Sequence, residues 1–361
     1  MPDIGVAPGT YTARPEIEMG GTLMPALSDG LQELLVEETV AGMSRCEATF
    51  ANWGPKSGSL DFLYFDRQLF DFGKTINITI GGGDASGVIF SGRVMGLEGR
   101  YLRSRPPELL VLAEDRLQDM RLTRRTRTFE NSSDSDVFQQ VASQYGLQTN
   151  IDANGPTYRV LAQVNESDLS FVRERARAID AELWIDGKTL NVQSRNHRKT
   201  DDVTLTFGQG LLEFSVLADI AGQTSGFVVS GWDVSGKQAL NHRATDSVLS
   251  SELNGDVGGS KALATAIGQH DQQIVHDLPL TAQETQALSE SEYRRVARRF
   301  VTGMGIAEGD ARLRVGTKLK LRSLGTMFDG SYYVSRVRHL FDATNGYRTQ
   351  FFVERPGIST S

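Results

Sequence analysis

Five histidines are the residues of this sequence best suited to bind a metal, because imidazole and nearby carboxylate groups are common ligands of transition metals. Only His270 and His276 lie close together, and Asp271 and Asp277 follow them directly. No thiol or further imidazole lies at ligand spacing from this group. We therefore interpret the four residues as solvated side chains of a polar segment, and we expect neither a metal nor a cofactor.

Nucleophilic catalysis would require an activated serine or cysteine with a base beside it. The sequence lacks the Gly-x-Ser-x-Gly motif of hydrolases. Its single cysteine, Cys46, alternates with apolar Ala48 and Phe50, which predicts a buried thiol. The glycine-rich segments 81–87 and 303–305 lack the features of phosphate-binding loops and are interpreted as turns. The sequence also singles out no carboxylate pair for glycoside hydrolysis, so we predict no catalytic residue.

The most pronounced charge feature is a basic stretch between residues 116 and 127, in which Asp119 is the single acid. Its five arginines are Arg116, Arg121, Arg124, Arg125 and Arg127. A cationic surface of this kind could face an acidic partner or the lumen of a channel. It could equally be a solvated strand edge, where charges discourage edge-to-edge pairing. Both interpretations stay open, and these arginines are our candidate partner-facing residues.

A second basic set lies on a predicted helix of about residues 282–302. Thr281 and Glu284 have the spacing of a capping box, and Gly303 would end the helix. Glu290 precedes the first arginine of the set by one helical turn and can pair with it. The four arginines are Arg294, Arg295, Arg298 and Arg299. We interpret this set as a solvated helix face, with a partner contact as the alternative.

Strand patterns dominate the elements that would position these residues. Residues 45–50 and 75–80 alternate between apolar and polar side chains, as in strands with one buried face. Residues 88–94 predict the returning strand of a hairpin. We expect residues 31–128 to form a first small β-barrel. Residues 1–30, rich in Pro, Gly and Thr, are expected to form an N-terminal arm.

Outside the long helix, helical patterns fall within residues 129–198, where two predicted helices alternate with short strands. Ser133 and Asp136 have the spacing of a capping box at the start of the first helix. We expect an α/β insert over this range, with Phe171 and Trp184 in its core.

Strand patterns return after residue 200, so we expect residues 199–361 to form a second β-barrel that contains the long helix. The predicted fold class is therefore α+β and β-rich. It has two β-barrel modules, an α/β insert between them and a long helix in the second module.

Composition limits the classes of function. A net charge of −7 over 361 residues argues against a general nucleic-acid binder, which needs a cationic surface to displace counterions. One cysteine excludes an internal disulfide. The first residues lack the basic start and apolar stretch of a signal peptide, and no apolar run approaches the roughly 20 residues that span a bilayer. We expect synthesis in the host cytoplasm, no membrane segment and no recognition of nucleic-acid sequence.

Several strings, in order over roughly residues 30–355, carry a resemblance to a known family. The strongest is VNESDLSFV at residues 164–172, followed by AELW at residues 181–184. Further matches lie at residues 122–129, 207–214, 228–233, 328–334, 338–341 and 346–349. In these strings the sequence resembles the late control D proteins of phages and the N-terminal half of VgrG spike proteins. These are baseplate hubs of contractile tails and injection systems.

The resemblance implies a structural protein and not an enzyme. Family members form homotrimers, in which each chain carries two barrels similar to the inner tail-tube subunit. Six barrels would then connect a six-fold inner tube to a three-fold central spike. VgrG chains continue into the spike, whereas this sequence stops at Ser361. We therefore expect a separate spike protein as a partner, besides the inner tube protein and other baseplate subunits.

This reading places the protein in the baseplate of a virion tail or of a phage-derived injection particle, and the sequence does not separate the two. Two other functions stay open. A tail-associated cell-wall hydrolase would be favoured by convergent carboxylates with a raised pKa in a pocket. A β-rich adhesin or carbohydrate-binding module would be favoured by an exposed aromatic platform, although Trp53, Trp184 and Trp232 are scattered along the sequence.

Overall fold

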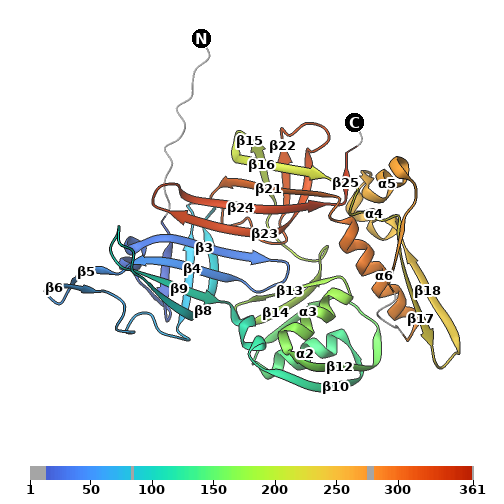
Figure 1. Ribbon diagram of the computed structural model, residues 1–361, viewed down its shortest axis with the longest axis horizontal. Coiled ribbons are helices and arrows are strands. Elements are labelled where there is room, and N and C mark those ends of the chain that lie inside the picture. Colours follow the sequence, from blue (N-terminus) through green and yellow to red (C-terminus); the bar gives the residue numbers. More distant parts are fainter. Residues whose placement is uncertain (1–13, 83–84, 275–279, 360–361) are drawn as a thin grey trace, which may run out of the picture.

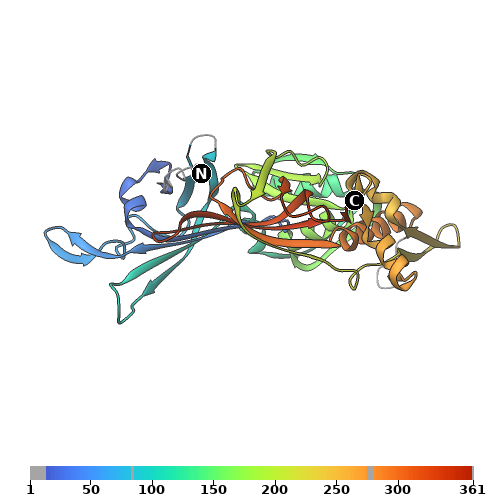
Figure 2. The same ribbon diagram turned by 90° about the horizontal axis from the view of Figure 1, so that it is seen from above.

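The computed structural model describes residues 14–82, 85–274 and 280–359. Two β modules lie side by side, with an α/β insert below them and a helical region at one end (Figure 1). Seen from above, the molecule is elongated, and hairpins project from both ends (Figure 2). The predicted class is confirmed: a β-rich α+β fold with two β modules, an insert between them and a long helix.

The first β module is a curved sheet around its own core. Its strands lie in the order β2-β1-β7-β8-β9-β4-β3. Their bounds are β1 (Glu16–Met19), β2 (Thr22–Leu23), β3 (Leu31–Thr39), β4 (Arg45–Ala51), β7 (Thr75–Ile80), β8 (Gly87–Arg100) and β9 (Glu108–Glu114). The predicted alternation is confirmed, because Ile76, Ile78 and Ile80 of β7 and Cys46 of β4 are buried. This alternation gives the sheet one apolar face around which it curls.

The segment that the sequence predicts as an arm, residues 1–30, contributes β1 and α1 (Pro25–Gly30) to this module in its described part. β1 pairs with β7, where Ile17 lies opposite Ile78 in the core. Helix α1 contacts β1 and β4. Apolar and polar side chains alternate over residues 16–19, as in a strand. This pattern of four residues, between Pro15 and Gly20, is too short to predict β1.

Two hairpins extend beyond the first sheet. One consists of β5 (Trp53–Lys56) and β6 (Ser59–Phe62), and the other is the outer end of the β8–β9 pair. Both project from the same end of the molecule (Figure 2). They are the part of the first module that lies farthest from the second module.

The second module is a closed β-barrel. Its strands are β15 (Val203–Phe207), β16 (Gly210–Ala218), β21 (Val301–Glu308), β22 (Lys318–Arg322), β23 (Gly330–Asp342) and β24 (Gly346–Arg355). They follow the order β23-β22-β15-β16-β21-β24, and the pairing of β24 with β23 closes the ring. The barrel interior contains alternate residues of these strands, such as Leu319, Val334 and Phe351.

One strand pair joins the two modules. β3 lies antiparallel to β23, from Glu33 opposite Asp342 to Thr39 opposite Arg336, so a single sheet of thirteen strands runs through both modules. Beside this seam, Arg314 donates hydrogen bonds to the carboxylate of Glu38 and, at 2.8 Å, to the carbonyl of Val88. Burial alone would raise the pKa of Glu38, but the Arg314 guanidinium holds it below its usual value.

The insert packs two helices against two small sheets. Its elements are the 3₁₀ helix η2 (Arg116–Arg121), β10 (Arg124–Ser133), α2 (Asp134–Gln144), β11 (Gln148–Asp152), β12 (Thr157–Ser167), α3 (Asp168–Ala178), β13 (Ala181–Asp186) and β14 (Thr189–Ser194). The predicted capping box between Ser133 and Asp136 is confirmed. Phe171 is buried as predicted and stacks on Phe129 at 5.5 Å. The prediction that Trp184 lies in this core is wrong: its ring is half-buried outside the core, and the Arg198 guanidinium covers it at 4.0 Å.

The helical region lies at the end opposite the first module. It contains η3 (Asp246–Leu249), α4 (Ser250–Leu253), α5 (Gly259–Ile267) and α6 (Ala282–Ala297), together with β17 (Gly226–Asp233), β18 (Gln238–Ala244), β19 (Val257–Gly258), β20 (Asp271–Ile274) and β25 (Gly357–Ile358). Helix α6 begins at the predicted Thr281 cap, whose hydroxyl accepts from Glu284 N at 3.2 Å. It ends at Ala297, short of the predicted residue 302, because Val301 already starts β21.

Candidate interaction surfaces

The five predicted partner-facing arginines do not form one outward surface. Arg125 and Arg127 of β10 both point to Asp168, the first residue of α3, with nitrogen–oxygen distances of 3.1 and 2.6 Å. Asp168 is fully buried and also accepts from Tyr145 Oη at 2.7 Å and Gln163 Nε2 at 2.9 Å. Burial alone would raise its pKa, but these donors and the two guanidinium groups hold it below the usual value.

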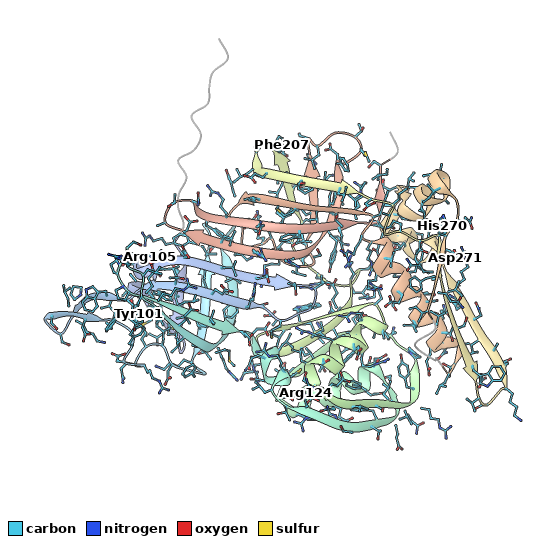
Figure 3. The ribbon with its side chains drawn as sticks, in the orientation of Figure 1. Tyr101, Arg105, Arg124, Phe207, His270 and Asp271 are labelled. Carbon is cyan, nitrogen blue, oxygen red and sulfur yellow. The ribbon has the colours of Figure 1, made fainter. Side chains whose placement is uncertain are left out.

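Each of the other three arginines also has a partner within the chain. Arg116 donates to the carbonyl of Tyr145 at 3.1 Å, and Arg124 donates to the carbonyl of Asn165 at 2.9 Å. Arg121 pairs with Glu114. Arg124 lies on the lower edge of the insert (Figure 3). All five arginines therefore have partners within the chain, and a contact with another protein stays a prediction for the exposed members Arg121, Arg124 and Arg125.

The arginines of α6 divide into exposed and buried groups. Arg294 pairs with Glu290 at 3.0 Å, as the one-turn spacing predicts, and Arg295 pairs with Glu292. Arg298 differs from the predicted solvated face, because only 7% of its side chain is exposed. Its position at the C-cap turns it away from solvent toward the insert.

Arg298 belongs to a buried polar network at the junction of insert, helical region and barrel. It donates to Asp180 after α3 and to Glu252 of α4. Next to it, Arg195 pairs with Glu182 of β13 at 3.3 Å and with Glu354 of β24 at 2.5 Å. The sequence did not predict this network. Some of its members, such as Asp180 and Arg298, are more than a hundred residues apart, and no local sequence pattern connects them.

An aromatic cluster, here called the aromatic tip, lies at the base of the β5–β6 hairpin and beside the outer end of the β8–β9 hairpin of the first module. Trp53 and Phe62 have ring centroids 5.1 Å apart, Phe62 and Phe65 lie at 5.0 Å, and Tyr101 lies 6.2 Å from Phe62. Trp53 is 40% exposed and Tyr101 is 66% exposed. Tyr101 lies in the same part of the molecule as the β5–β6 hairpin, which projects beyond it (Figure 3). Exposed aromatic groups of this kind are common at interaction surfaces, since contact of the rings with water is unfavourable.

Sequence reasoning also missed this aromatic tip. Its rings come from β5, β6, a loop and the β8–β9 hairpin, so they are brought together only by the fold. A further exposed ring, Trp232, lies on the β17–β18 hairpin at the opposite end and is 52% exposed.

Asp115 is the carboxyl group that most resembles a catalytic acid, because burial raises its pKa to about 7 and it borders a cleft of about 530 Å³. Both of its oxygens are engaged by backbone amides, Oδ2 by Ser44 at 2.6 Å and Oδ1 by Leu117 at 2.9 Å. It caps η2 in this way. The geometry of Asp115 is that of a structural cap and gives no support to a hydrolase.

The described part of the chain contains no group of three or more His, Cys, Asp or Glu residues that could hold a metal. His270 and Asp271 lie at the end of the helical region (Figure 3), where Asp271 pairs with Arg243 at 2.7 Å. His276 and Asp277 fall outside the described residues. Among the described helices, none is long and apolar enough to cross a membrane.

Comparison with solved structures places this fold among tail proteins. A 43 kDa tail protein of prophage MuSo2 from Shewanella oneidensis has a TM-score of 0.70 at 13% identity, covering 96% of this chain and 100% of the other. A tail protein from Neisseria meningitidis has a TM-score of 0.69 at 12% identity, with 96% and 98% covered. An E. coli component of the type VI secretion system, described as similar to the T4 tail proteins gp27 and gp5, reaches 0.53 at 11% identity, with 90% and 73% covered.

These similarities confirm the predicted resemblance to the late control D and VgrG proteins at the level of the fold. The sequence also matches the family described as Alg8 N-terminal domain over residues 11–342, and the chain belongs to this family. No curated protein matches the chain significantly.

Proposed function

We propose that this protein is a structural baseplate hub, a homotrimer that links the six-fold inner tube of a contractile tail or injection system to a three-fold central spike. The observation that carries the proposal is the presence of two β modules within one chain, a curved sheet of seven strands and a closed barrel of six strands, joined into one sheet of thirteen strands. Three such chains would supply six modules in a ring. A three-fold spike could then bind one side of the ring and a six-fold tube the other.

The modules suited to contact the tube are the regions 31–128 and 199–361, and the insert of residues 129–198 would lie on the outer side. The similar fold of phage tail proteins and of a type VI secretion component supports a structural role in such an assembly. The expected partners are the spike protein, the inner tube protein and neighbouring baseplate subunits.

The aromatic tip of the first module is the surface we assign to contact between subunits. It projects beyond the sheet, and its rings would be buried if the tip reached the next chain in a ring. Burial of large aromatic side chains is a common source of association energy at protein interfaces.

The test of the hub is the mass of the purified protein in solution, measured by light scattering coupled to size exclusion, alone and with the spike protein of the same assembly. A mass three times the 39.6 kDa of one chain, or a complex of three chains with three spike chains, is the expected result. Electron microscopy should then show a ring of six lobes. A chain that stays monomeric at high concentration and in the presence of the spike would contradict the proposal.

A glycan-binding module is the second candidate, because the aromatic tip provides the exposed rings that such a module needs. Its rings are mostly inclined to one another, as Trp53 is to Phe62 at 77°, and do not form one flat platform. A glycan array with the purified protein separates the two candidates. The glycan-binding module would be favoured if the array shows binding and if Trp53→Ser and Tyr101→Ser abolish it without changing the mass of the protein in solution.

A further inference from the structure

A cleft of about 760 Å³ lies where the insert, α6 and the closed barrel meet. Seven arginines and three acidic residues line it. The acidic residues, Asp180, Glu182 and Glu354, are all engaged in the buried network with Arg298 and Arg195. Their charges are therefore already compensated before any ligand enters the cleft.

Of the five remaining arginines of the cleft, Arg295 pairs with Glu292, and the other four lack such compensation. Arg173, Arg177 and Arg299 form no salt bridge with any described residue, and Arg336 stacks on the ring of Phe352 at 4.9 Å. Arg173 is half-buried, and its Nε has no hydrogen-bond partner within the described part of the chain. Burial lowers the pKa of Arg173, which means that its charge is poorly solvated where it stands.

This concentration of cations is unusual for the molecule as a whole, whose net charge is −7. A concave site lined by one sign of charge focuses its field and attracts ligands of the opposite sign. Guanidinium groups bind carboxylates through two parallel hydrogen bonds. The cleft therefore has the charge and the donors for a ligand that carries several carboxylates.

The lining also contains apolar side chains, among them Val40, Leu183 and Val353. An extended peptide presents both charged and apolar side chains, so it matches such a mixed surface. A nucleic-acid duplex would instead need a long cationic track along its phosphates, which a short cleft on an acidic protein does not provide.

We propose that this cleft is a docking site for an acidic peptide segment of another protein, held by Arg173, Arg177, Arg299 and Arg336. The inference goes beyond the hub function, since it needs neither the trimer nor the spike. The docking site and the hub function are tested separately, because binding to the cleft is measured on the single chain. One proposal can therefore be wrong while the other holds.

The test uses the full-length chain and a short fluorescein-labelled peptide of alternating Glu and Ala, with a Gln-Ala peptide as the probe control. Fluorescence anisotropy should show binding to the Glu peptide only, and the affinity should fall as salt is added. The triple variant Arg177→Gln, Arg299→Gln and Arg336→Gln changes exposed residues of the cleft. It should weaken binding by about tenfold or more.

A matched variant removes the same charge elsewhere: Arg103→Gln, Arg159→Gln and Arg322→Gln, all exposed and outside the cleft. It should bind the Glu peptide within about twofold of the parent chain. Equal weakening in the two variants would show that diffuse charge attracts the peptide and would overturn the proposal. Absence of binding at low salt would overturn it as well.

A second measurement needs no variant. Phenylglyoxal modifies accessible arginines, and mass spectrometry should show that bound Glu peptide protects Arg177 and Arg299 but not Arg103. Absence of this protection would contradict the proposal. Displacement of the peptide by a single-stranded oligonucleotide or by tripolyphosphate at lower concentrations than by unlabelled peptide would reject a peptide ligand in favour of a phosphate ligand.

Discussion

Arg298, at the C-terminal end of α6, donates hydrogen bonds to both carboxylate oxygens of Asp180, which lies just after α3 and 118 residues earlier in the sequence. The same guanidinium donates to Glu252 of α4. One side chain thus connects the helical region to the insert, and burial makes the connection sensitive to loss of any member.

We expect Arg298→Gln to lower the free energy of unfolding by about 3–5 kcal/mol, because Glu252 would lose its salt-bridge partner and Asp180 would keep only the more distant Arg294, at 3.7 Å. Urea denaturation followed by circular dichroism measures this change. Arg295→Gln is the control, since Arg295 is half-exposed and should change stability by less than about 1 kcal/mol. Similar effects of both substitutions would show that the buried network contributes no more than a surface pair.

Asp168→Asn should destabilise the insert by about 3 kcal/mol, because Arg125 and Arg127 would lose their shared anionic partner. Glu166→Gln, two residues away, is the control, since no side-chain partner of Glu166 is found in the described structure. It should change stability by less than about 0.5 kcal/mol. Thermal unfolding monitored by calorimetry tests the pair. A neutral Asp168→Asn would contradict the structural role of the two arginines.

His339 and Asp115 should give opposite pH dependences of stability. Burial lowers the pKa of His339 to about 3, so the unfolded chain binds more protons below its ordinary pKa near 6.5. The stability that neutral His339 provides is present above about pH 6.5 and is lost as the pH falls toward 3. Burial raises the pKa of Asp115 to about 7, so its contribution is present below about pH 4 and is lost as the pH rises toward 7.

Denaturation at several pH values checks this. Between about pH 4 and 6, the stability difference between the parent chain and His339→Gln should rise with pH by about 1.4 kcal/mol per unit. The difference between the parent chain and Asp115→Asn should fall by about the same amount per unit over this range. If both stability differences changed with pH in the same direction, the burial assigned to either His339 or Asp115 would be wrong.

Trp53→Ser together with Tyr101→Ser should weaken association of the chains by about 2 kcal/mol or more if the aromatic tip is the subunit contact. Sedimentation equilibrium measures the effect. The stability of the isolated chain should stay within about 1 kcal/mol of the parent, because both side chains are substantially exposed. Trp232→Ser at the opposite end is the comparison and should leave association unchanged.

Cys46 should react with a thiol reagent only when the first module opens. Its side chain is buried, and burial raises the pKa of the thiol, so little thiolate is present or reachable. Labelling by a disulfide reagent should be slow in buffer and complete in denaturant. Rapid labelling of the folded chain would show that β4 is not held in the core.

Local patterns predicted much of the fold. The alternation of β7 identified its buried isoleucines, and the Ser133 and Thr281 caps identified the starts of α2 and α6, because a cap depends on residues within one turn. The four-residue β1 was missed, since a strand of that length is defined by its pairing with β7 and not by its own sequence.

The site residues were less predictable for a related reason. The sequence showed that Arg125, Arg127 and Arg298 are charged, but not that Asp168 and Asp180 lie beside them in the fold. Likewise, the aromatic tip draws its rings from residues 53 to 101. Contacts between distant residues depend on tertiary packing, which single-sequence patterns do not encode.

The seam between β3 and β23 has a mechanical consequence. Because seven residue pairs of one antiparallel ladder connect the modules, a pull applied to one module is transmitted to the other along the strands. Such a load would shear many hydrogen bonds at once and would not open them one after another. The Arg314–Glu38 contact adds a buried polar link beside the ladder. We therefore expect the two modules to move as one stiff body under load, with little rotation against each other.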